Sequence, residues 1–247
     1  MINLIKGETL KAMQDLIDDG IIVDMILADL PYGTTNNKWD SVIPFDKMWE
    51  LYWKILKPTG VIALTASQPF SSALLMSQPK HFRHEWIWIK NRGSNFANTI
   101  REPMKEHEQL LIFSKGKWTY NKQMQERTGG GASRANYNVK YESKSENYKD
   151  FDGRKKNKLT KLRVPSTWQK FNTDTSRLHP TIKPVPLFEY FIKTYSNENE
   201  IILDNTMGSG TTAIACINTK RNFIGIELDE VYYNVAKERV RHNTSLN

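Results

Sequence analysis

Residues 201–212, with the sequence IILDNTMGSGTT, are the segment that decides the fold. A short apolar run at residues 201–203 is followed by a turn with Gly208 and Gly210, and Thr211 then begins a helical pattern. Glycines in such a turn let the backbone approach a ligand closely, and a helix N-terminus favours a negatively charged group. The segment lacks the Gly-Lys-Ser/Thr ending of a phosphate-binding loop, so that kind of site is excluded.

Glu227 follows the next apolar run, residues 222–226, and lies 17 residues after Gly210. In nucleotide-binding βαβ units, an acidic residue about 20 residues after the glycines accepts hydrogen bonds from ribose hydroxyls. A tight turn without a ligand is the alternative interpretation, and the paired acid makes it the weaker one. We therefore expect a ligand with ribose hydroxyls at this turn.

The same alternation of short apolar runs and helical patterns extends through most of the chain and predicts a mostly parallel α/β sheet. Seven strands are expected, at residues 2–5, 23–28, 61–65, 85–90, 109–113, 201–203 and 222–226. Helices are expected at residues 10–18 and 45–56, and from about Pro69, Pro184, Thr211 and Glu230. The fourth and fifth strands are close enough in sequence to form an antiparallel edge pair.

The alternation lapses between Lys115 and Leu178, where aliphatic residues are few and three consecutive glycines occur. This segment has 16 Lys or Arg and 6 Asp or Glu, a net charge of +10, whereas the whole chain has +8 and the remainder therefore −2. We interpret residues 1–114 and 179–247 as two halves of one domain, and residues 115–178 as a basic insertion. Within it, Arg154, Lys155 and Lys156 (the basic run) have aromatic residues nearby and are expected to contact nucleic-acid phosphates.

The bulk composition bounds the class of protein. At 247 residues the chain is long enough for one large α/β domain with an insertion. No apolar run approaches the roughly 20 residues that span a bilayer, so no membrane role is expected. No secretory signal is visible, and Cys216 is the only cysteine, so a reducing cytoplasm is the expected location. The histidines lack metal-ligand spacing, so no metal site is expected.

Asp29-Leu30-Pro31-Tyr32 directly follows the predicted strand at residues 23–28, where ligands bind in open α/β sheets. The exocyclic amino group of adenine or cytosine is a poor nucleophile, because its lone pair is delocalised into the ring. Two acceptors for its N–H groups, the Asp29 carboxylate and the Leu30 carbonyl, would draw the nitrogen towards tetrahedral geometry. Pro31 stiffens the turn, and Tyr32 offers a face on which an extruded base can stack. An ordinary loop, in which Asp29 starts a turn, Pro31 fixes it and Tyr32 packs, is the alternative interpretation of this motif alone.

A third motif, residues 179–184 (HPTIKP), precedes a predicted helix and on its own indicates only a loop with a helix-starting proline. In this order, the three motifs resemble the β group of amino-directed DNA methyltransferases, in which a D-P-P-Y motif comes first and H-P-x-x-K-P and F-x-G-x-G motifs come last. The resemblance covers nearly the whole chain except the insertion. It implies the α/β, seven-stranded, doubly wound sheet of S-adenosylmethionine-dependent methyltransferases, circularly permuted so that the family's third strand comes first.

The resemblance implies a role for each motif residue. Target-base chemistry is assigned to Asp29, Leu30, Pro31 and Tyr32. Binding of S-adenosylmethionine is assigned to Asp204, Met207, Gly208, Gly210, Thr211 and Glu227, with Thr181 and Lys183 near its methionine end and Glu8 near its adenine. Two positions depart from the family pattern: Leu30 replaces the first proline, and Met207 replaces an aromatic residue, which leaves the packing against the cofactor open.

The expected function is site-specific methylation of adenine N6 in double-stranded DNA, with the target base flipped out of the duplex. Asp29 favours adenine, because the family more often has Ser at this position for cytosine N4. Cytosine N4 and RNA remain alternative substrates, and a non-catalytic nucleic-acid-binding protein or a small-molecule methyltransferase fits less well. Methylation of cytosine at C5 needs a cysteine nucleophile in a suitable loop. Cys216, the only cysteine, follows an alanine within a predicted helix, so this chemistry is a poor fit. Family members also occur as homodimers, but the sequence identifies no interface.

Overall fold

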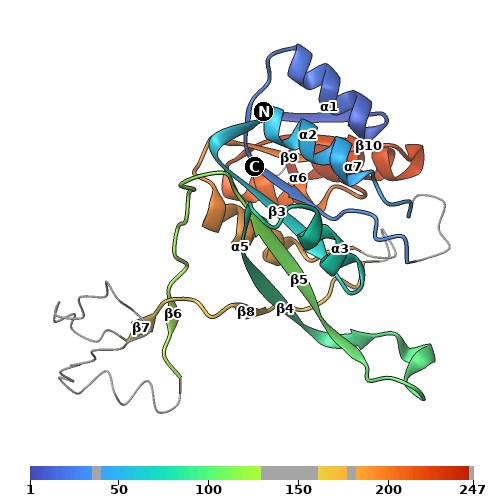
Figure 1. Cartoon of the computed structure of the whole chain (residues 1–247), viewed down its shortest axis with the longest axis vertical. Coiled ribbons are helices and arrows are strands. Elements are labelled where there is room, and N and C mark those ends of the chain that lie inside the picture. The colour runs from blue at the N-terminus through green and yellow to red at the C-terminus, as the bar shows by residue number, and fades with distance from the viewer. Residues whose placement is uncertain (35–39, 129–160, 177–181, 245–247) are drawn as a thin grey trace. The chain divides into compact units, whose positions relative to one another are not determined.

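Strands and helices alternate along the chain in this computed structural model, as the hydrophobic pattern predicts (Figure 1). The structure describes residues 1–34, 40–128, 161–176 and 182–244. The strands are β1 (Ile2–Lys6), β2 (Val23–Ala28), β3 (Leu56–Ala66), β4 (Phe82–Ser94), β5 (Lys105–Phe113), β6 (Gln125–Glu126), β7 (Leu162–Arg163), β8 (Trp168–Lys170), β9 (Ile201–Asp204) and β10 (Asn222–Glu227). The helices are α1 (Thr9–Asp18), α2 (Phe45–Ile55), α3 (Phe70–Ser77), α5 (Val185–Tyr195), α6 (Thr211–Thr219) and α7 (Glu230–Thr244), with a 3-10 turn η1 (Phe96–Asn98). In these described ranges, no helix has the length and apolar content needed to cross a lipid bilayer.

The main sheet has the strand order β1-β10-β9-β2-β3-β5-β4-β8. Neighbouring strands are parallel except at β5, which runs antiparallel to both β3 and β4. The predicted mostly parallel α/β sheet and its antiparallel pair are therefore confirmed. In the described residues the sheet has eight strands rather than seven, because β8, a three-residue strand within the predicted insertion, pairs with β4.

Helices cover both faces of the sheet, because consecutive side chains of its buried central strands are apolar and point to opposite faces. On β2, Ile26 and Ala28 belong to the core cluster formed with α1, α2 and α3. Met25 and Leu27 belong to the opposite cluster, formed with α5, α6 and α7. The sheet is thus held rigidly between two apolar layers, and the loops at its carboxyl edge are positioned by that scaffold.

The chain divides into two compact units, residues 1–121 with 167–247 and residues 122–166. The described part of the second unit contains one antiparallel pair, β6 with β7. The predicted insertion, residues 115–178, contains this unit, but its ends belong to the first unit because β8 is part of the main sheet. The basic run at residues 154–156 lies outside the described residues.

Candidate active site

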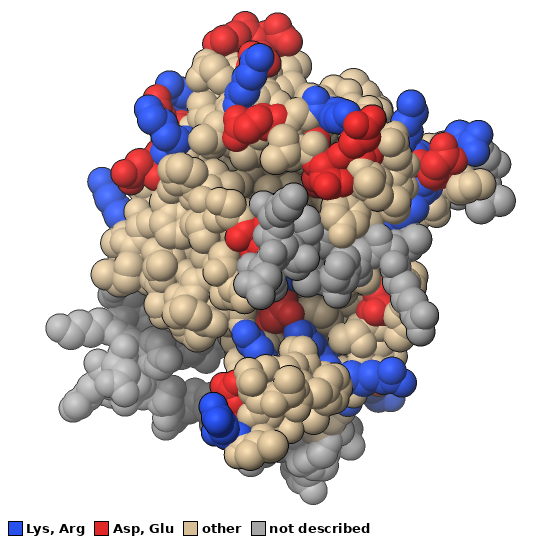
Figure 2. Space-filling model, turned by 90° about the vertical axis from the view of Figure 1, so that its right-hand side faces the viewer, with Lys and Arg blue, Asp and Glu red and all other residues tan. Residues whose placement is uncertain are grey.

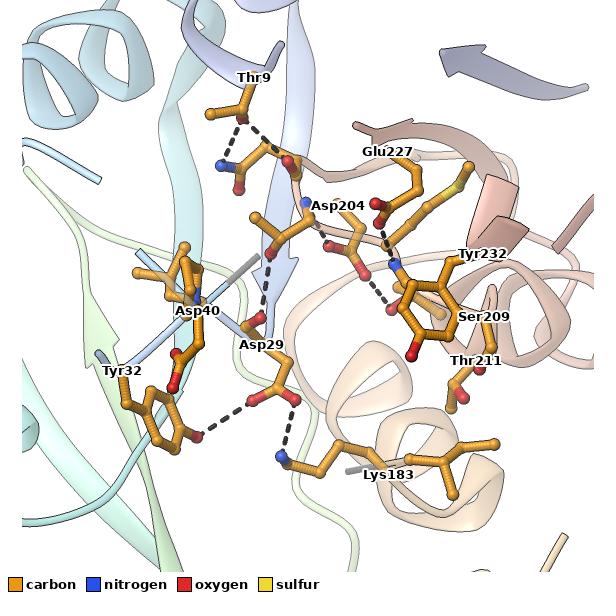
Figure 3. Close-up of a pocket in the computed structure, with 18 of the residues that line it drawn as sticks. Thr9, Asp29, Tyr32, Asp40, Lys183, Asp204, Ser209, Thr211, Glu227 and Tyr232 are labelled. Atoms are coloured by element: carbon orange, nitrogen blue, oxygen red, sulfur yellow. Dashed lines mark hydrogen bonds and ion pairs between the residues drawn. The ribbon is translucent and has the colours of Figure 1, made fainter. Parts of the chain in front are cut away.

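A cleft of about 870 Å³ opens at the carboxyl ends of the parallel strands (Figure 3). It lies where β2 and β9 are neighbours and the chain leaves them in opposite directions across the sheet, the position at which open α/β sheets bind ligands. Asp29 directly follows β2 and Asp204 ends β9, and both line the cleft. Two motifs that are far apart in the sequence therefore share one site.

Asp29 has hydrogen-bond donors at both carboxylate oxygens. The hydroxyl of Tyr32 lies 3.0 Å from Oδ1, which also accepts from the hydroxyl of Thr65, and Oδ2 accepts from Nζ of Lys183 at 2.7 Å. The hydroxyl of Thr206 donates to the backbone carbonyl of Asp29 at 3.1 Å, which ties the glycine turn to this loop. The Asp29 side chain is still 24% exposed, so a group entering the cleft can reach the carboxylate.

The ring of Tyr32 lies beside Asp29. It stacks on Phe70 with centroids 5.0 Å apart and 26° between the ring planes, and the Lys183 ammonium lies 5.8 Å from its centroid. Burial, together with the negative charge of Asp29, raises the pKa of the Tyr32 phenol well above its usual range. The phenol therefore stays protonated and acts as a hydrogen-bond donor.

The loop that carries this motif is fixed in place. The carboxylate of Asp40 accepts hydrogen bonds from the backbone N–H groups of Gly33 (2.8 Å) and Thr34 (2.9 Å). The Leu30 side chain is buried in the core against the sheet. In the described part of the chain, no donor reaches the carbonyl oxygen of Leu30. This oxygen is therefore suited to accept a hydrogen bond from a ligand.

Four charged side chains form a chain of alternating sign that begins at Asp29. Lys183 pairs with Asp29 and lies 3.3 Å from Oε2 of Glu108, whose Oε1 lies 2.5 Å from Nζ of Lys90. The Lys183 and Lys90 side chains are only 7% and 8% exposed. Burial acts to lower the pKa of Lys183, but Asp29 and Glu108 outweigh it and raise this pKa well above its usual range. Burial acts to raise the pKa of Glu108, and the two lysines outweigh it and lower this pKa.

Sequence reasoning missed Glu108, Lys90 and Thr65. Lys90 ends the strand predicted at residues 85–90, and Glu108 precedes the strand predicted at residues 109–113 by one residue, but the structure places them on β4 and β5. For Lys90 the available signal was a charged residue directly after the apolar and aromatic run at residues 86–89, whereas Glu108 lies in a polar stretch and gave no such signal. The resemblance assigned Lys183 to the methionine end of the cofactor, whereas the structure pairs its ammonium with Asp29 and Glu108.

The glycine turn has the backbone geometry that its sequence predicts. Gly208 and Gly210 have φ angles of 51° and 82°, which glycine adopts without steric cost. A Cβ on Gly210 would lie 2.9 Å from the Cβ of Ala236, so α7 packs directly against the turn. The guanidinium of Arg239, also on α7, donates to the carbonyl oxygen of Ser209 at 2.7 Å. The last helix therefore holds the shape of this turn.

Met207 is buried beneath the turn, where the family more often has an aromatic residue. Its sulfur occupies space next to Gly225, and a Cβ on Gly225 would collide with it. The long, flexible Met207 side chain thus fills space that is free because Gly225 has no side chain.

Glu227 and Glu8 both line the cleft and both accept backbone hydrogen bonds. Glu227 accepts from Gly208 at 2.8 Å and from Asp229 at 2.7 Å, so the turn and the acid fix each other. Burial raises the pKa of Glu227. Glu8 caps the N-terminus of α1 by accepting from the N–H groups of residues 10 and 11, at 3.0 and 2.8 Å. Its structural role as a cap accounts for its position without a ligand.

Asp204 is the most deeply buried acid of the site, with 2% exposure. Its carboxylate accepts from the backbone N–H of Thr206 at 3.1 Å and from the hydroxyl of Thr212. Burial, followed by nearby negative charge from Asp29 and Glu227, raises its pKa to about 7. A positively charged or hydroxyl-bearing ligand would favour the ionised form of this acid and of Glu227.

The structure brings most of the predicted site residues to one cleft. The residues that line it are Glu8, Asp29, Leu30, Pro31, Tyr32, Lys183, Asp204, Met207, Gly208, Thr211 and Glu227. Gly210 shapes the turn beside them. Thr181 and the basic run lie outside the described residues, so their predicted roles stay predictions.

Comparisons with known proteins identify the family. Residues 23–238 match the family of N6/N4-type DNA methylases, described as DNA methylase. The chain is 28% identical to type II methyltransferase M.HpaI of Haemophilus parainfluenzae, over 96% of this chain and 73% of that protein. It is 30% identical to type II methyltransferase M1.MboII of Moraxella bovis, over 87% of each.

Solved structures agree with this assignment. The crystal structure of an M1.HpyAVI-SAM complex has a TM-score of 0.67 and 27% identity, covering 97% of this chain and all of that one. The cytosine-N4-specific PvuII DNA methyltransferase has a TM-score of 0.65, covering 99% of this chain and 90% of that one, and at 13% identity it supports the fold alone. The chain belongs to the DNA methylase family, and S-adenosylmethionine is its cofactor. The predicted family and cofactor are confirmed.

The cleft residues fit S-adenosylmethionine. Asp204 is buried and Glu227 is half-buried, and the raised pKa values of these two acceptors make hydroxyl, ammonium or sulfonium groups favourable neighbours. Gly208 lines the cleft and has no side chain, so a ligand can approach the backbone of the turn closely at this residue. These residues would hold the cofactor, which supplies an electrophilic methyl group carried on a sulfonium.

Proposed function

We propose that this chain methylates the exocyclic N6 of adenine at a specific site in duplex DNA, with the target base extruded into the cleft. The observation that carries the proposal is the Asp29 carboxylate, which is partly exposed in the cleft that the glycine turn and Glu227 also line. An acid at this position matches the chemistry of an amino group, which needs hydrogen-bond acceptors to become nucleophilic.

Asp29 can accept the target amine without losing Lys183, because each carboxylate oxygen can accept two hydrogen bonds. The amine N–H would bind Oδ2 beside the ammonium, and the carbonyl of Leu30 would accept the second N–H. Both acceptors are held by the packed loop, so they need little reorganisation during the reaction. The Tyr32 ring supports the plane of the base by stacking.

Lys183, Thr65 and Tyr32 position the Asp29 carboxylate by donating to it. The proton lost from the methylated nitrogen goes to water or to this carboxylate. Removing an electrostatic stabiliser of this kind typically lowers turnover by about 10²–10³. Asp29→Ala and Asp29→Asn should therefore retain DNA and cofactor binding and lose most activity.

The choice of adenine rests on Asp29, since the family more often has Ser at this position for cytosine N4. The exocyclic amines of both bases lie next to a ring nitrogen acceptor, so Asp29 and Leu30 could receive either one. Cytosine N4 therefore remains the second candidate, with the same residues in the same roles.

The test is incubation of the protein with labelled S-adenosylmethionine and mixed-sequence duplex DNA, single-stranded DNA or RNA, followed by nucleoside analysis by mass spectrometry. N6-methyladenine from duplex DNA is expected, and sequencing of the product maps the modified site. The matched control for the Asp29 variants is Asp15→Asn, on the exposed face of α1. N4-methylcytosine as the sole product would overturn the choice of base, and near-normal turnover by Asp29→Ala would overturn the mechanism.

A further inference from the structure

The β4–β5 hairpin extends well beyond the strands that the sequence predicts, and its tip (residues 95–104) projects from the body of the first unit (Figure 1). Pairing continues to Ser94 and Lys105. β4 runs in the same direction as β3, since both are antiparallel to β5, so the tip extends from the carboxyl edge of the sheet. That edge is also the edge of the active-site cleft.

The hairpin that carries the tip also lines the cleft. Trp88, Lys90 and Ser94 on β4 and Glu108 on β5 are cleft residues. Phe96 is two residues beyond Ser94, and an extended residue spans at most about 3.6 Å, so their Cα atoms are within about 7 Å of each other. The tip therefore begins at the rim of the site where the target base would enter.

The tip exposes apolar side chains. Phe96 is 67% exposed and Ile100 is 95% exposed, and Met104 is partly exposed and packs against Gly93 on the opposite strand. Single exposed apolar residues are common, but two large ones on one short projecting turn leave an apolar surface with no partner inside the described part of the protein. Such a surface is suited to insertion into another molecule.

Local hydrogen bonds hold the tip in one shape. The Asn95 amide donates to the Glu102 carboxylate at 2.6 Å, and the Asn98 amide donates to the Asn95 side-chain oxygen at 2.9 Å. The Thr99 hydroxyl donates to the carbonyl oxygen of Phe96 at 2.9 Å. β4 is flanked by β5 and β8, and the Trp88 indole donates to a backbone carbonyl beyond β8 at 2.9 Å. The apolar side chains are thus presented from a stiff support.

Positive charge accompanies the apolar tip. Residues 91–105 include Arg92, Arg101 and Lys105 and one acid, Glu102, whose carboxylate is bonded within the tip. In the space-filling view from the side towards which the hairpin points, Lys and Arg side chains, with some acidic ones, lie beside a mostly uncharged projection in the lower part of the picture (Figure 2). Apolar groups flanked by cations suit a duplex, because phosphates surround the stacked bases.

We propose that this tip inserts Phe96 and Ile100 into duplex DNA beside the target base and fills the space that the extruded base leaves, while Arg92, Arg101 and Lys105 contact the adjacent phosphates. The inference rests on the proposed function and adds to it a DNA contact outside the basic insertion. Apolar side chains that enter a base step replace part of the lost stacking. The two apolar side chains therefore lower the free energy of base extrusion rather than that of initial DNA binding.

The experiment uses the double variant Phe96→Ala with Ile100→Ala on a duplex that carries the methylated site mapped above. On the paired duplex, kcat/KM is expected to fall by about 10- to 100-fold, because unstacking a base costs a few kcal/mol. On the same duplex with an abasic position opposite the target base, the loss should shrink to within about threefold, because the target is already weakly held. A merely structural defect would not be rescued in this way.

Two matched variants and one optical signal complete the test. Phe96→Leu keeps an apolar side chain and should retain most activity. Ile22→Ala is the control, because it removes an exposed apolar side chain just before β2, at the opposite edge of the sheet from the tip. Fluorescence of 2-aminopurine at the target position should rise with the wild-type protein and rise less with the double variant. Calorimetric cofactor affinity and circular dichroism should be unchanged by all three variants.

The outcomes separate this inference from the proposed function. Wild-type protein that methylates no DNA overturns the function. Active wild-type protein with an equally active double variant overturns the inference alone, as does an equal loss on paired and abasic duplexes. A drop in molecular mass of the double variant in sedimentation, with unchanged fluorescence, would make the tip a contact between two copies of this chain and would also overturn it.

Discussion

Replacing Asp204 by asparagine should change how the stability of the fold depends on pH. Burial raises the pKa of Asp204 from 3.8 to about 7, a shift of about 3 units. Because the folded state binds this proton more tightly than the unfolded state, the contribution of Asp204 to stability is fully present below about pH 4 and is lost as pH rises through about 7. At 1.36 kcal/mol per unit, the loss totals about 4 kcal/mol, of which about 3 kcal/mol falls between pH 5 and pH 8.

The asparagine side chain of the Asp204→Asn variant cannot ionise, so the stability of that variant lacks this decline. The measurement is urea unfolding followed by circular dichroism at pH 5, 6, 7 and 8, for the wild-type and variant proteins without cofactor. The difference in free energy of unfolding between them should shift in favour of the variant by about 3 kcal/mol across this range. Other titrating groups are shared by both proteins and largely cancel in the difference.

Glu50→Gln provides a control of opposite sign. The exposed Glu50 carboxylate has a lowered pKa, because Lys54 donates a hydrogen bond to it and Lys54 and Lys47 are positively charged. Its contribution is present above its usual pKa and is lost only as pH falls into the acid range, so its difference curve should be flat from pH 5 to pH 8. A flat curve for Asp204→Asn as well would refute the argument that burial keeps this acid protonated.

The remaining predictions concern ligand binding and the charged network. Glu227→Ala should weaken S-adenosylmethionine binding at least about tenfold by calorimetry, since a charge-assisted hydrogen bond contributes about 1.5–3 kcal/mol, and unchanged affinity would remove Glu227 from the cofactor site. Tyr32→Phe should keep substantial turnover because the stacking face remains, whereas Tyr32→Ala should lose about 1–3 kcal/mol of stacking, and equal effects of the two would contradict that role. Lys183→Met should lower the free energy of unfolding by about 3–5 kcal/mol, because it leaves the buried Glu108 without one cation, and adding Glu108→Gln should recover part of that loss. Alanine at all three positions of the basic run should reduce the slope of log DNA affinity against log salt concentration by about 0.9 for each phosphate contact that is lost. An unchanged slope would mean that the run is only exposed to solvent and contacts no phosphate.

The sheet and the cleft could be predicted because their determinants are local in the sequence. Each parallel strand is a short apolar run, and Asp29 and Glu227 each come directly after such a run. The resemblance then indicates that the two halves share one site, a relation that spacing alone could not establish. Thr65 could not be predicted as a site residue, because a threonine at the end of a buried strand is ordinary β-sheet composition.

The features that were missed depend on contacts between distant segments. β8 has three residues in a basic segment, and only its pairing with β4 makes it a strand. The hairpin tip is rich in asparagine and charged residues, which indicates a loop but not that two strands carry it away from the body. Lys90 and Glu108 are buried charges that only tertiary pairing stabilises, so strand propensity could not reveal them.

The pairing of β1 with β10 has a consequence for synthesis of the protein on the ribosome. Ile2 pairs with Phe223, and among the strands that the structure describes β1 has β10 as its single neighbour. β2 likewise lacks one of its two neighbours until β9 has been made. A nascent chain that has not yet reached β9 therefore carries apolar strands with open edges, which are sites for aggregation and for chaperone binding. Completion of the sheet therefore depends on late, non-local strand pairing, which slows folding.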